Sequence, residues 1–181
     1  MLRHYPLKSV NMTKTETPPP SLKKRIRSWS LQLFIVLLIL LAVEAFLTRG
    51  SVGMMAPAID STTINQQPFS LELFKGKPAI VHFWATWCPV CGLQEGSVES
   101  IAQDYPVITI ASWSEGEAAV RKYMHENGLT FPVMLDDSGQ LARSFGLKGV
   151  PASFILSPHG EIAYVETGYT TETGLRLRLW L

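Results

Sequence analysis

One stretch, AIVHFWATWCPVC at residues 79–91, restricts the fold of this chain more than any other. Its first six residues are almost continuously apolar, which is typical of a central β-strand covered on both faces. The strand leads into a helix predicted over about 88–103. Cys88 opens this helix, and Pro89 suits the first helical turn, where a missing N–H costs nothing. The pattern predicts a buried sheet with two thiols at a strand-to-helix junction.

The sequence after this junction alternates between strand-like and helix-like segments. Ser114 and Glu117 have the S-x-x-E spacing of a capping box, which would open a helix through about Asn127. Ser138 would cap a shorter helix that ends at Gly146. The remaining predicted elements are extended segments at 107–112, 131–135, 152–156 and 162–166, and a closing helix at 171–181. This alternation, ending in a hairpin, indicates an α/β sandwich with a mixed sheet.

The chain has two cysteines, so an intramolecular disulfide can only join Cys88 and Cys91. A C-x-x-C pair is compatible with half of a metal site, with a redox pair or with two inert thiols. A structural zinc site needs four ligands, and no second cysteine pair is present. The histidines lie without metal-ligand spacing, at His4, His82, His125 and His159. We therefore expect a redox pair and neither a metal nor a cofactor.

The predicted helix start explains why this pair would be reactive. Unpaired backbone N–H groups and the positive end of the helix dipole favour the thiolate of Cys88, and the thiolate is the attacking form. Cys91 follows one turn later on the same face and can reach the first sulfur. Cys88 would attack a substrate disulfide and Cys91 would resolve the mixed disulfide, while the reverse sequence would donate a disulfide.

The charges are distributed unevenly along the chain. Residues 1–30 carry seven Lys/Arg and one Glu, a net charge of +6, whereas residues 50–181 carry eight Lys/Arg and thirteen Asp/Glu, a net charge of −5. An acidic domain without a basic stripe argues against nucleic-acid binding. The basic cluster directly precedes the longest apolar run, which indicates a membrane signal.

That run, residues 30–47, contains only two strongly polar residues, Gln32 and Glu44. As a helix it would reach roughly 27 Å, close to the ~30 Å hydrocarbon core of a bilayer. We expect an uncleaved anchor in the lipid bilayer of the cytoplasmic (inner) membrane. A cleavable signal peptide, with Val43 and Ala45 at the cleavage site, is the alternative, although its apolar core is usually shorter.

These patterns predict four parts. Residues 1–28 would form a polar, disordered cytoplasmic tail, 29–48 the single transmembrane anchor, 49–57 a flexible linker and 58–181 one globular domain. The basic residues before the run keep the tail in the cytoplasm by the positive-inside rule, so the domain lies in the periplasm or outside the cell. That compartment supports disulfides.

The stretch AIVHFWATWCPVC resembles the strand and active-site helix of the thioredoxin superfamily, and the resemblance covers about 58–181. Residues 115–162, with GVP at 149–151, look like the TlpA/DsbE (CcmG) branch. The anchor and the CPVC sequence are similar to those of ScsD-type suppressor-of-copper-sensitivity proteins within that branch. The resemblance implies a thioredoxin-like three-layer sandwich with a central mixed sheet.

The resemblance also implies a substrate groove around the cysteines. Trp87 would flank it, although a plain packing role is the alternative, and Pro89 and Val90 would face the substrate between the two thiols. Pro151 would be a cis-proline opposite the disulfide, and Val150 would present its backbone to an extended substrate peptide. All five groove positions lie within 87–90 or 150–151.

His82 occupies the position where thioredoxins carry a buried acid, six residues before the nucleophile. An imidazole there could act as a base near neutral pH, or it could be a strand histidine satisfied by hydrogen bonds. Two further positions differ from the TlpA/DsbE branch, which often has Glu and Pro where this chain has Gln94 and Gly96.

Taken together, we expect a membrane-anchored extracytoplasmic thiol–disulfide oxidoreductase. It would reduce protein disulfides, and a membrane electron donor would return its cysteine pair to the reduced form. A dithiol oxidase is one alternative. A copper-binding or copper-delivery module is another, because thiolates can hold Cu(I). Copper-delivery relatives of this fold usually space their cysteines C-x-x-x-C, which Cys88 and Cys91 do not match. A redox-silent scaffold would not need the intact pair.

Overall fold

The computed structural model describes residues 32, 34–39 and 52–181. The chain divides into two compact units, Met1–Ala45 and Phe46–Leu181. Residues 34–39 of the first unit are helical and exposed. No helix within the described ranges is both long enough and apolar enough to cross a membrane. Most of the predicted anchor, and the whole predicted tail, lie outside the described residues.

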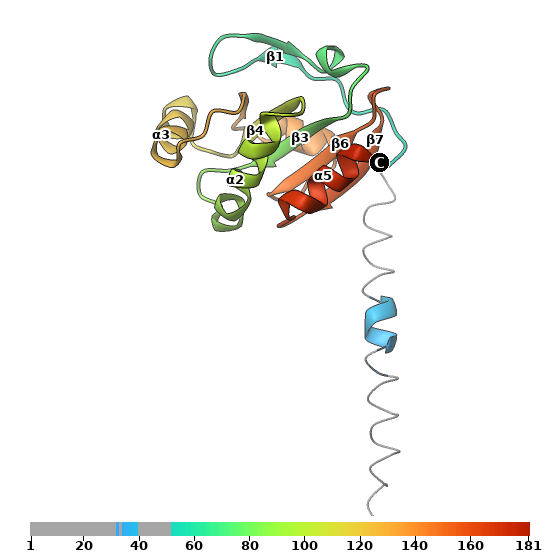
Figure 1. Ribbon diagram of the computed structural model, residues 1–181. Coiled ribbons are helices and arrows are strands. Elements are labelled where there is room, and N and C mark those ends of the chain that lie inside the picture. The colour runs from blue at the N-terminus through green and yellow to red at the C-terminus, as the bar shows by residue number, and fades with distance from the viewer. Residues whose placement is uncertain (1–31, 33, 40–51) are drawn as a thin grey trace, which may run out of the picture. The chain divides into compact units, whose positions relative to one another are not determined.

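The second unit is built on a five-stranded sheet with the order β5-β4-β3-β6-β7 (Figure 1). Strands β3, β4 and β5 run parallel, whereas β6 and β7 run antiparallel to their neighbours. The prediction of a mixed sheet is therefore confirmed. The strands are β3 Ala79–Trp84, β4 Val107–Ser112, β5 Val133–Asp136, β6 Ala152–Leu156 and β7 Ile162–Thr167.

Side chains of the sheet alternate between two hydrophobic clusters, one on each face. On β3, Ile80 and Trp84 belong to one cluster, while Val81 and Phe83 belong to the other. The first cluster is completed by residues of three helices, α2 Pro89–Ala102, α3 Glu117–Asn127 and α5 Glu172–Trp180. The second takes Ile59, which directly precedes the exposed strand β1 Asp60–Thr62, and residues of β2 Pro68–Ser70, η1 Leu71–Phe74 and α4 Gln140–Ser144. All six residues of β3 are buried, as its apolar run predicted.

The capping box predicted for α3 is wrong. The helix begins after Gly116, which makes no side-chain capping bond. The Ser114 hydroxyl instead accepts a hydrogen bond from the Thr86 N–H at 3.2 Å and donates one to the Ser112 carbonyl at 3.2 Å. Ser114 therefore ties the loop after β4 to the loop before Cys88, and this use of its side chain excludes the cap.

The cap predicted at Ser138 for α4 is also wrong. The N-cap residue is Gly139, and the two oxygens of buried Asp136 accept the N–H groups of Leu141 and Ala142 at 3.1 and 2.9 Å. The end of β5 thus caps the helix across the intervening turn. Gly139 has φ +69°, and a Cβ there would overlap the Trp113 indole, so this turn requires glycine.

Part of the predicted linker is paired with the domain. The Gly53 N–H donates to the Ile162 carbonyl at 2.8 Å, and the Ile162 N–H donates to the Met54 carbonyl at 2.8 Å. The Ala56 N–H donates to the Gly160 carbonyl at 3.0 Å. The segment 53–56 therefore extends the sheet beside the start of β7 instead of forming a flexible tether.

Helix α3 is fixed to α2 by a buried polar contact. The Tyr123 hydroxyl donates to Glu95 Oε2 at 3.1 Å, and a Cβ on Gly92 would lie 3.4 Å from the same hydroxyl. Burial raises the pKa of Glu95, and the hydrogen bond from Tyr123 opposes that shift. Burial and the neighbouring Glu95 raise the pKa of Tyr123 to about 12. The other oxygen of Glu95 is buried and has no partner among the described residues.

We predict that ionisation of Glu95 lowers the free energy of unfolding of the domain as pH rises above the usual carboxyl pKa range. Its pKa is higher in the folded than in the unfolded state, so protonated Glu95 contributes stability below the unfolded value. That contribution is lost as pH rises through the folded value. Glu95→Gln should therefore gain stability relative to wild type as pH rises, with a difference on the order of 1 kcal/mol near neutral pH. Urea unfolding followed by tryptophan fluorescence, at acidic and at neutral pH, measures this.

The matched control is Glu126→Gln, an exposed position on α3. This variant should follow the wild-type pH dependence. A Glu95→Gln curve parallel to the wild-type curve across the same range would contradict the prediction.

Candidate functional site

Cys88 and Cys91 are joined by a disulfide at the start of α2, with their Cα atoms 5.3 Å apart. Cys88 is the N-cap residue of the helix, and its backbone is extended, with φ −94° and ψ 105°. The Cys91 N–H points at Cys88 Sγ at 3.2 Å. This places the first sulfur where a helix end offers unpaired N–H groups, an arrangement that stabilises a thiolate.

The two sulfur-bearing residues differ in access to solvent. Cys91 is 0% exposed and Cys88 is 6% exposed. Around Cys88 the surface carries large side chains, because Trp87 is 59% and Val90 41% exposed, and Pro89 is also exposed. A partner that approaches from outside meets Cys88 first.

The loop before β6 closes over the same sulfur. The Val150–Pro151 peptide bond is cis, as the resemblance implied. Cys88 Sγ lies 3.8 Å from the Val150 carbonyl oxygen. The structure thus brings together two segments that lie 62 residues apart in the sequence.

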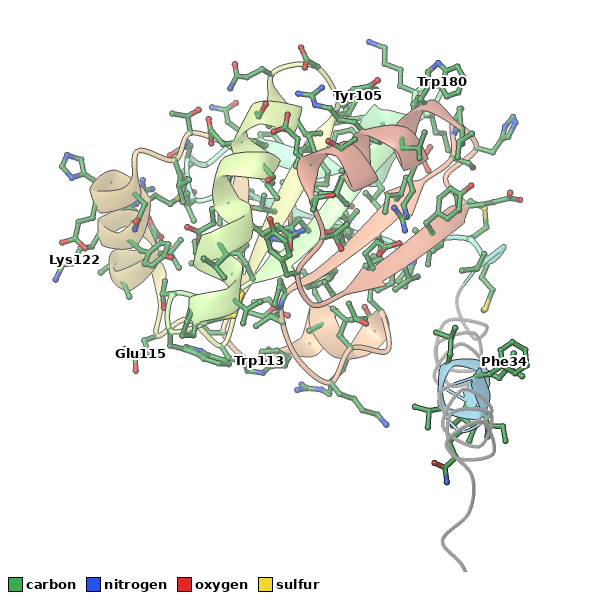
Figure 2. The ribbon with its side chains drawn as sticks, turned by 60° about the horizontal axis from the view of Figure 1, so that its bottom comes forward. Phe34, Tyr105, Trp113, Glu115, Lys122 and Trp180 are labelled. Carbon is green, nitrogen blue, oxygen red and sulfur yellow. A yellow bond between two sulfur atoms is a disulfide. The ribbon has the colours of Figure 1, made fainter. Side chains whose placement is uncertain are left out.

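A loop that the sequence did not single out fixes Trp87. Its indole N–H donates to the Trp113 carbonyl at 2.7 Å. Trp113 and Glu115 have positive φ values of 54° and 61°, and their segment lies at one edge of the domain (Figure 2). These residues give no local sequence pattern, because their role depends on a contact across 26 residues.

His82 lies in the sheet on the side that α2 covers, and it is 1% exposed. Burial lowers its pKa to about 4, so the ring is neutral at neutral pH. Its Nδ1 lies 2.9 Å from the Ser153 hydroxyl on the neighbouring strand β6. Its Nε2 is buried without a hydrogen-bond partner among the described residues.

Gln94 connects this pair to the loop between β7 and α5. Its side chain is 0% exposed. The amide nitrogen donates to the Ser153 hydroxyl at 3.4 Å, and the amide oxygen accepts the Thr170 backbone N–H at 3.4 Å. The sequence identified Gln94 only as a departure from a family pattern. Ser153 and Thr170 were missed, since they lie 59 and 76 residues from Gln94.

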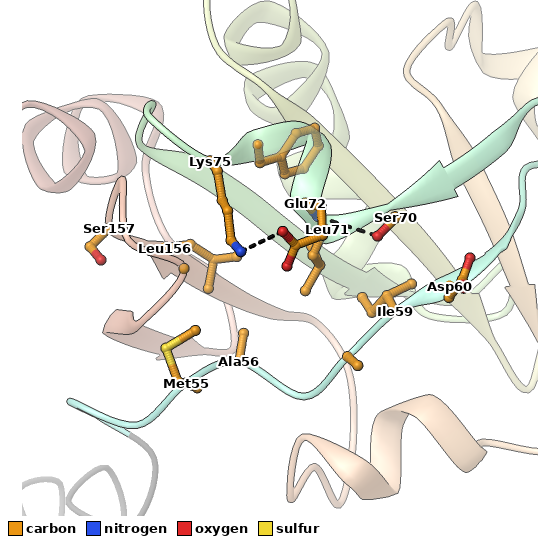
Figure 3. Close-up of a pocket in the computed structure, with 13 residues that line it drawn as sticks. Met55, Ala56, Ile59, Asp60, Ser70, Leu71, Glu72, Lys75, Leu156 and Ser157 are labelled. Carbon is orange, nitrogen blue, oxygen red and sulfur yellow. Dashed lines mark hydrogen bonds and ion pairs between the residues drawn. The ribbon is translucent and has the colours of Figure 1, made fainter.

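A cavity of this domain lies away from the cysteine pair. A cavity of about 360 Å³ lies between the N-terminal hairpin and the end of β6, lined by Ile59, Leu71 and Leu156, with the Glu72–Lys75 ion pair beside it (Figure 3). Neither cysteine contributes to its lining. Within the described part of the chain, no group of three His, Cys, Asp or Glu residues could hold a metal ion.

Several known proteins are similar to this chain in sequence. A model of the AhpC/TSA family matches residues 52–165. A thioredoxin-like protein of Haemophilus influenzae is 30% identical over 159 residues, which cover 87% of this chain and 95% of the relative. The thiol-disulfide oxidoreductase ResA of Geobacillus kaustophilus is 27% identical over 139 residues, or 73% of this chain and 78% of the relative.

Solved structures of thiol–disulfide exchange proteins have the same fold as this domain. StoA from Bacillus subtilis superposes with a TM-score of 0.59 at 28% identity, over 69% of this chain and 96% of that chain. A putative DsbE from Chlorobium tepidum shares the fold with a TM-score of 0.65 over 72% of this chain and 96% of that chain. These matches confirm the expected resemblance to the TlpA/DsbE branch, and the narrower likeness to ScsD-type proteins stays a hypothesis. With a cysteine pair at the start of α2 and a family match over most of the folded domain, this chain belongs to the AhpC/TSA family and is a thioredoxin-fold thiol–disulfide oxidoreductase.

Proposed function

We propose that this protein is a membrane-anchored, extracytoplasmic oxidoreductase that reduces disulfides of other proteins through Cys88 and Cys91. The observation that carries the proposal is the unequal access of the two thiols. Cys88 lies at the helix start beside exposed Trp87 and Val90, whereas Cys91 is fully buried behind it. This arrangement fits one attacking thiol and one resolving thiol.

The proposed reaction has two exchange steps. The Cys88 thiolate attacks one sulfur of a substrate disulfide, and the other substrate sulfur leaves as a thiolate and takes a proton from water. The Cys91 thiolate then attacks Cys88 Sγ of the mixed disulfide, and the second substrate sulfur leaves in the same way. Two electrons pass from the dithiol to the substrate, and the Cys88–Cys91 disulfide forms. A membrane dithiol donor would return the two electrons and complete the cycle.

The proposed groove places an extended substrate segment between Trp87 and the loop at Val150 and Pro151. The exposed Trp87 ring is held by its hydrogen bond to the Trp113 carbonyl, so it presents a fixed apolar face. The Val150 carbonyl lies beside the reactive sulfur, where a substrate cysteine would arrive. Pro89 and Val90 are exposed between the two thiols and complete the contact surface.

Two arguments support reduction as the direction. Val90, between the thiols, cannot donate a side-chain hydrogen bond or carry charge, so it adds no extra stabilisation of the Cys88 thiolate of the kind that makes a strong oxidant. The resemblance to the TlpA/DsbE branch, whose anchored members are mostly reductants, favours the same direction. Copper delivery is less favoured, because Cys88 and Cys91 lack the C-x-x-x-C spacing and no group of three His, Cys, Asp or Glu residues in the described part of the chain could hold a metal ion.

Trapping experiments test the roles of the two thiols. We predict that Cys91→Ser accumulates mixed disulfides through Cys88, because the second exchange step has lost its nucleophile. Non-reducing gels followed by mass spectrometry of the trapped species measure this. The matched variant Cys88→Ser should trap little, since Cys91 is buried. The opposite pattern, with trapping only in Cys88→Ser, would reverse the assignment.

Fractionation tests the anchor. We predict that the full chain stays with membranes after alkaline extraction, and that protease added to spheroplasts digests residues 50–181. Leu38→Arg with Leu41→Arg should release it, because each Arg at the centre of a span costs about 2.5–3.5 kcal/mol. Leu7→Arg with Leu22→Arg, outside the apolar run, is the control and should remain bound. A soluble mature form that begins near Phe46 would refute the proposal.

The direction is tested in growing cells. We predict that mass-tagged alkylation finds Cys88 and Cys91 mainly as free thiols, because a reductant is kept reduced by its donor. The Cys88→Ser, Cys91→Ser double variant supplies the untagged reference. A pair found fully oxidised would instead identify a dithiol oxidase.

A further inference from the structure

Beneath α2 runs a chain of hydrogen bonds whose direction can be assigned atom by atom. It begins at the backbone N–H of Thr170, which can only donate, so the Gln94 atom that meets it at 3.4 Å is the amide oxygen. The amide nitrogen of Gln94 must then face Ser153, to whose hydroxyl it donates at 3.4 Å. The backbone thus fixes the orientation of this buried amide.

The Ser153 hydroxyl transmits that direction to His82. A hydroxyl has one hydrogen and two acceptor lone pairs, and here one lone pair receives the Gln94 amide. The other side-chain neighbour of this oxygen among the described residues is His82 Nδ1, at 2.9 Å. The buried hydroxyl hydrogen is satisfied only if Nδ1 accepts it. The neutral ring then carries its own hydrogen on Nε2.

The remaining N–H of His82 is buried on the face of β3 that α2 covers. His82 and Trp84 share one face of β3, and Trp84 packs in the same hydrophobic cluster as Cys88 and Cys91. Gln94, which contacts the partner of His82, follows Cys91 by one helical turn, a rise of about 4.5 Å. Cys91 is therefore on the buried face of α2, one turn before the residue that contacts Ser153. In the disulfide form, Nε2 has no hydrogen-bond partner among the described residues.

We propose that Gln94 and Ser153 are positioning residues that hold His82 as its Nε2–H tautomer, and that this N–H donates a hydrogen bond to the Cys91 thiolate in the reduced protein. The second half rests on the proposed function. The ring transfers no proton in this scheme. When Cys91 ionises, its proton goes to water, and the N–H that lacks a partner beside the disulfide acquires one. The histidine then stabilises the resolving thiolate as a donor and does not act as its base.

Nitrogen NMR of the labelled full chain in detergent micelles tests the tautomer directly. The His82 resonances are identified by their absence in His82→Gln. The expected result at neutral pH is a protonated Nε2 and an unprotonated Nδ1. A protonated Nδ1, in either the other neutral tautomer or the imidazolium, would overturn the inference.

Gln94→Glu tests whether the relay sets the tautomer. A carboxylate of nearly the same shape can accept from Thr170 but cannot donate to Ser153. The Ser153 hydroxyl would then donate to the introduced carboxylate and accept from His82, so Nδ1 should become protonated. Gln140→Glu, at an exposed position of α4, adds the same charge away from the relay and should leave the wild-type pattern. An Nδ1 that stays unprotonated at a pH where the carboxyl carbon resonance shows the introduced Glu to be ionised would contradict the relay.

The effect on Cys91 is measured in the Cys88→Ser background, where one thiol remains. Adding His82→Leu should lower the thiolate population about tenfold at a given pH, since the thiolate loses a hydrogen-bond donor. Ultraviolet absorbance of the thiolate follows this titration. His82→Gln retains an N–H donor and should show a smaller loss.

If His82→Leu leaves the titration of Cys91 unchanged, His82 does not stabilise the Cys91 thiolate. A failure of the trapping experiment would contradict the proposed function but would not affect the NMR result on the tautomer. The two failures are therefore distinguishable.

Discussion

The complete burial of β3 is the constraint on which the rest of the domain depends. Five of its six residues belong to the two hydrophobic clusters, so each face needs its own covering layer. Its end delivers Cys88 to the first turn of α2. Its antiparallel pairing with β6, in which Phe83 lies opposite Ala152, places the end of one strand beside the start of the other. Pro151 directly precedes Ala152, and the reactive sulfur therefore meets the Val150 carbonyl.

Much of this arrangement could be predicted because its causes are local. A continuous apolar run predicted the buried strand, and the helix with the cysteines begins a few residues after the run ends. The helix caps were predicted wrongly because their partners are not local. Asp136 reaches past Ser138 to cap α4, and Ser114 bonds to Thr86, which lies 28 residues away. The short strands β1 and β2 have three residues each, too few to give a periodic pattern. The polar relay from Thr170 to His82 was invisible for the same reason, since only the folded sheet brings its members together.

The buried polar groups without partners are concentrated where the chemistry lies. In the described residues, the buried side-chain atoms that lack a hydrogen bond are His82 Nε2, Trp84 Nε1 and Glu95 Oε1. Two belong to β3 and one to α2, the elements that meet at the cysteines. Each unpaired buried polar group costs about 1–3 kcal/mol. The helix that carries the cysteines therefore packs on the part of the described interior where hydrogen bonding is least complete. A local departure from full hydrogen bonding is typical of functional sites.

The pairing of residues 53–56 with the start of β7 has a consequence for how this domain behaves among other proteins. Exposed sheet edges recruit strands from other chains and so promote aggregation. At one edge, Gly53, Met54 and Ala56 occupy backbone groups of Gly160 and Ile162. At the other edge, the Ile64 N–H donates to the Val133 carbonyl of β5 at 2.8 Å. The stretch 53–64 therefore covers the start of each edge strand, and a chain cut within it would be prone to self-association even with its redox site unchanged.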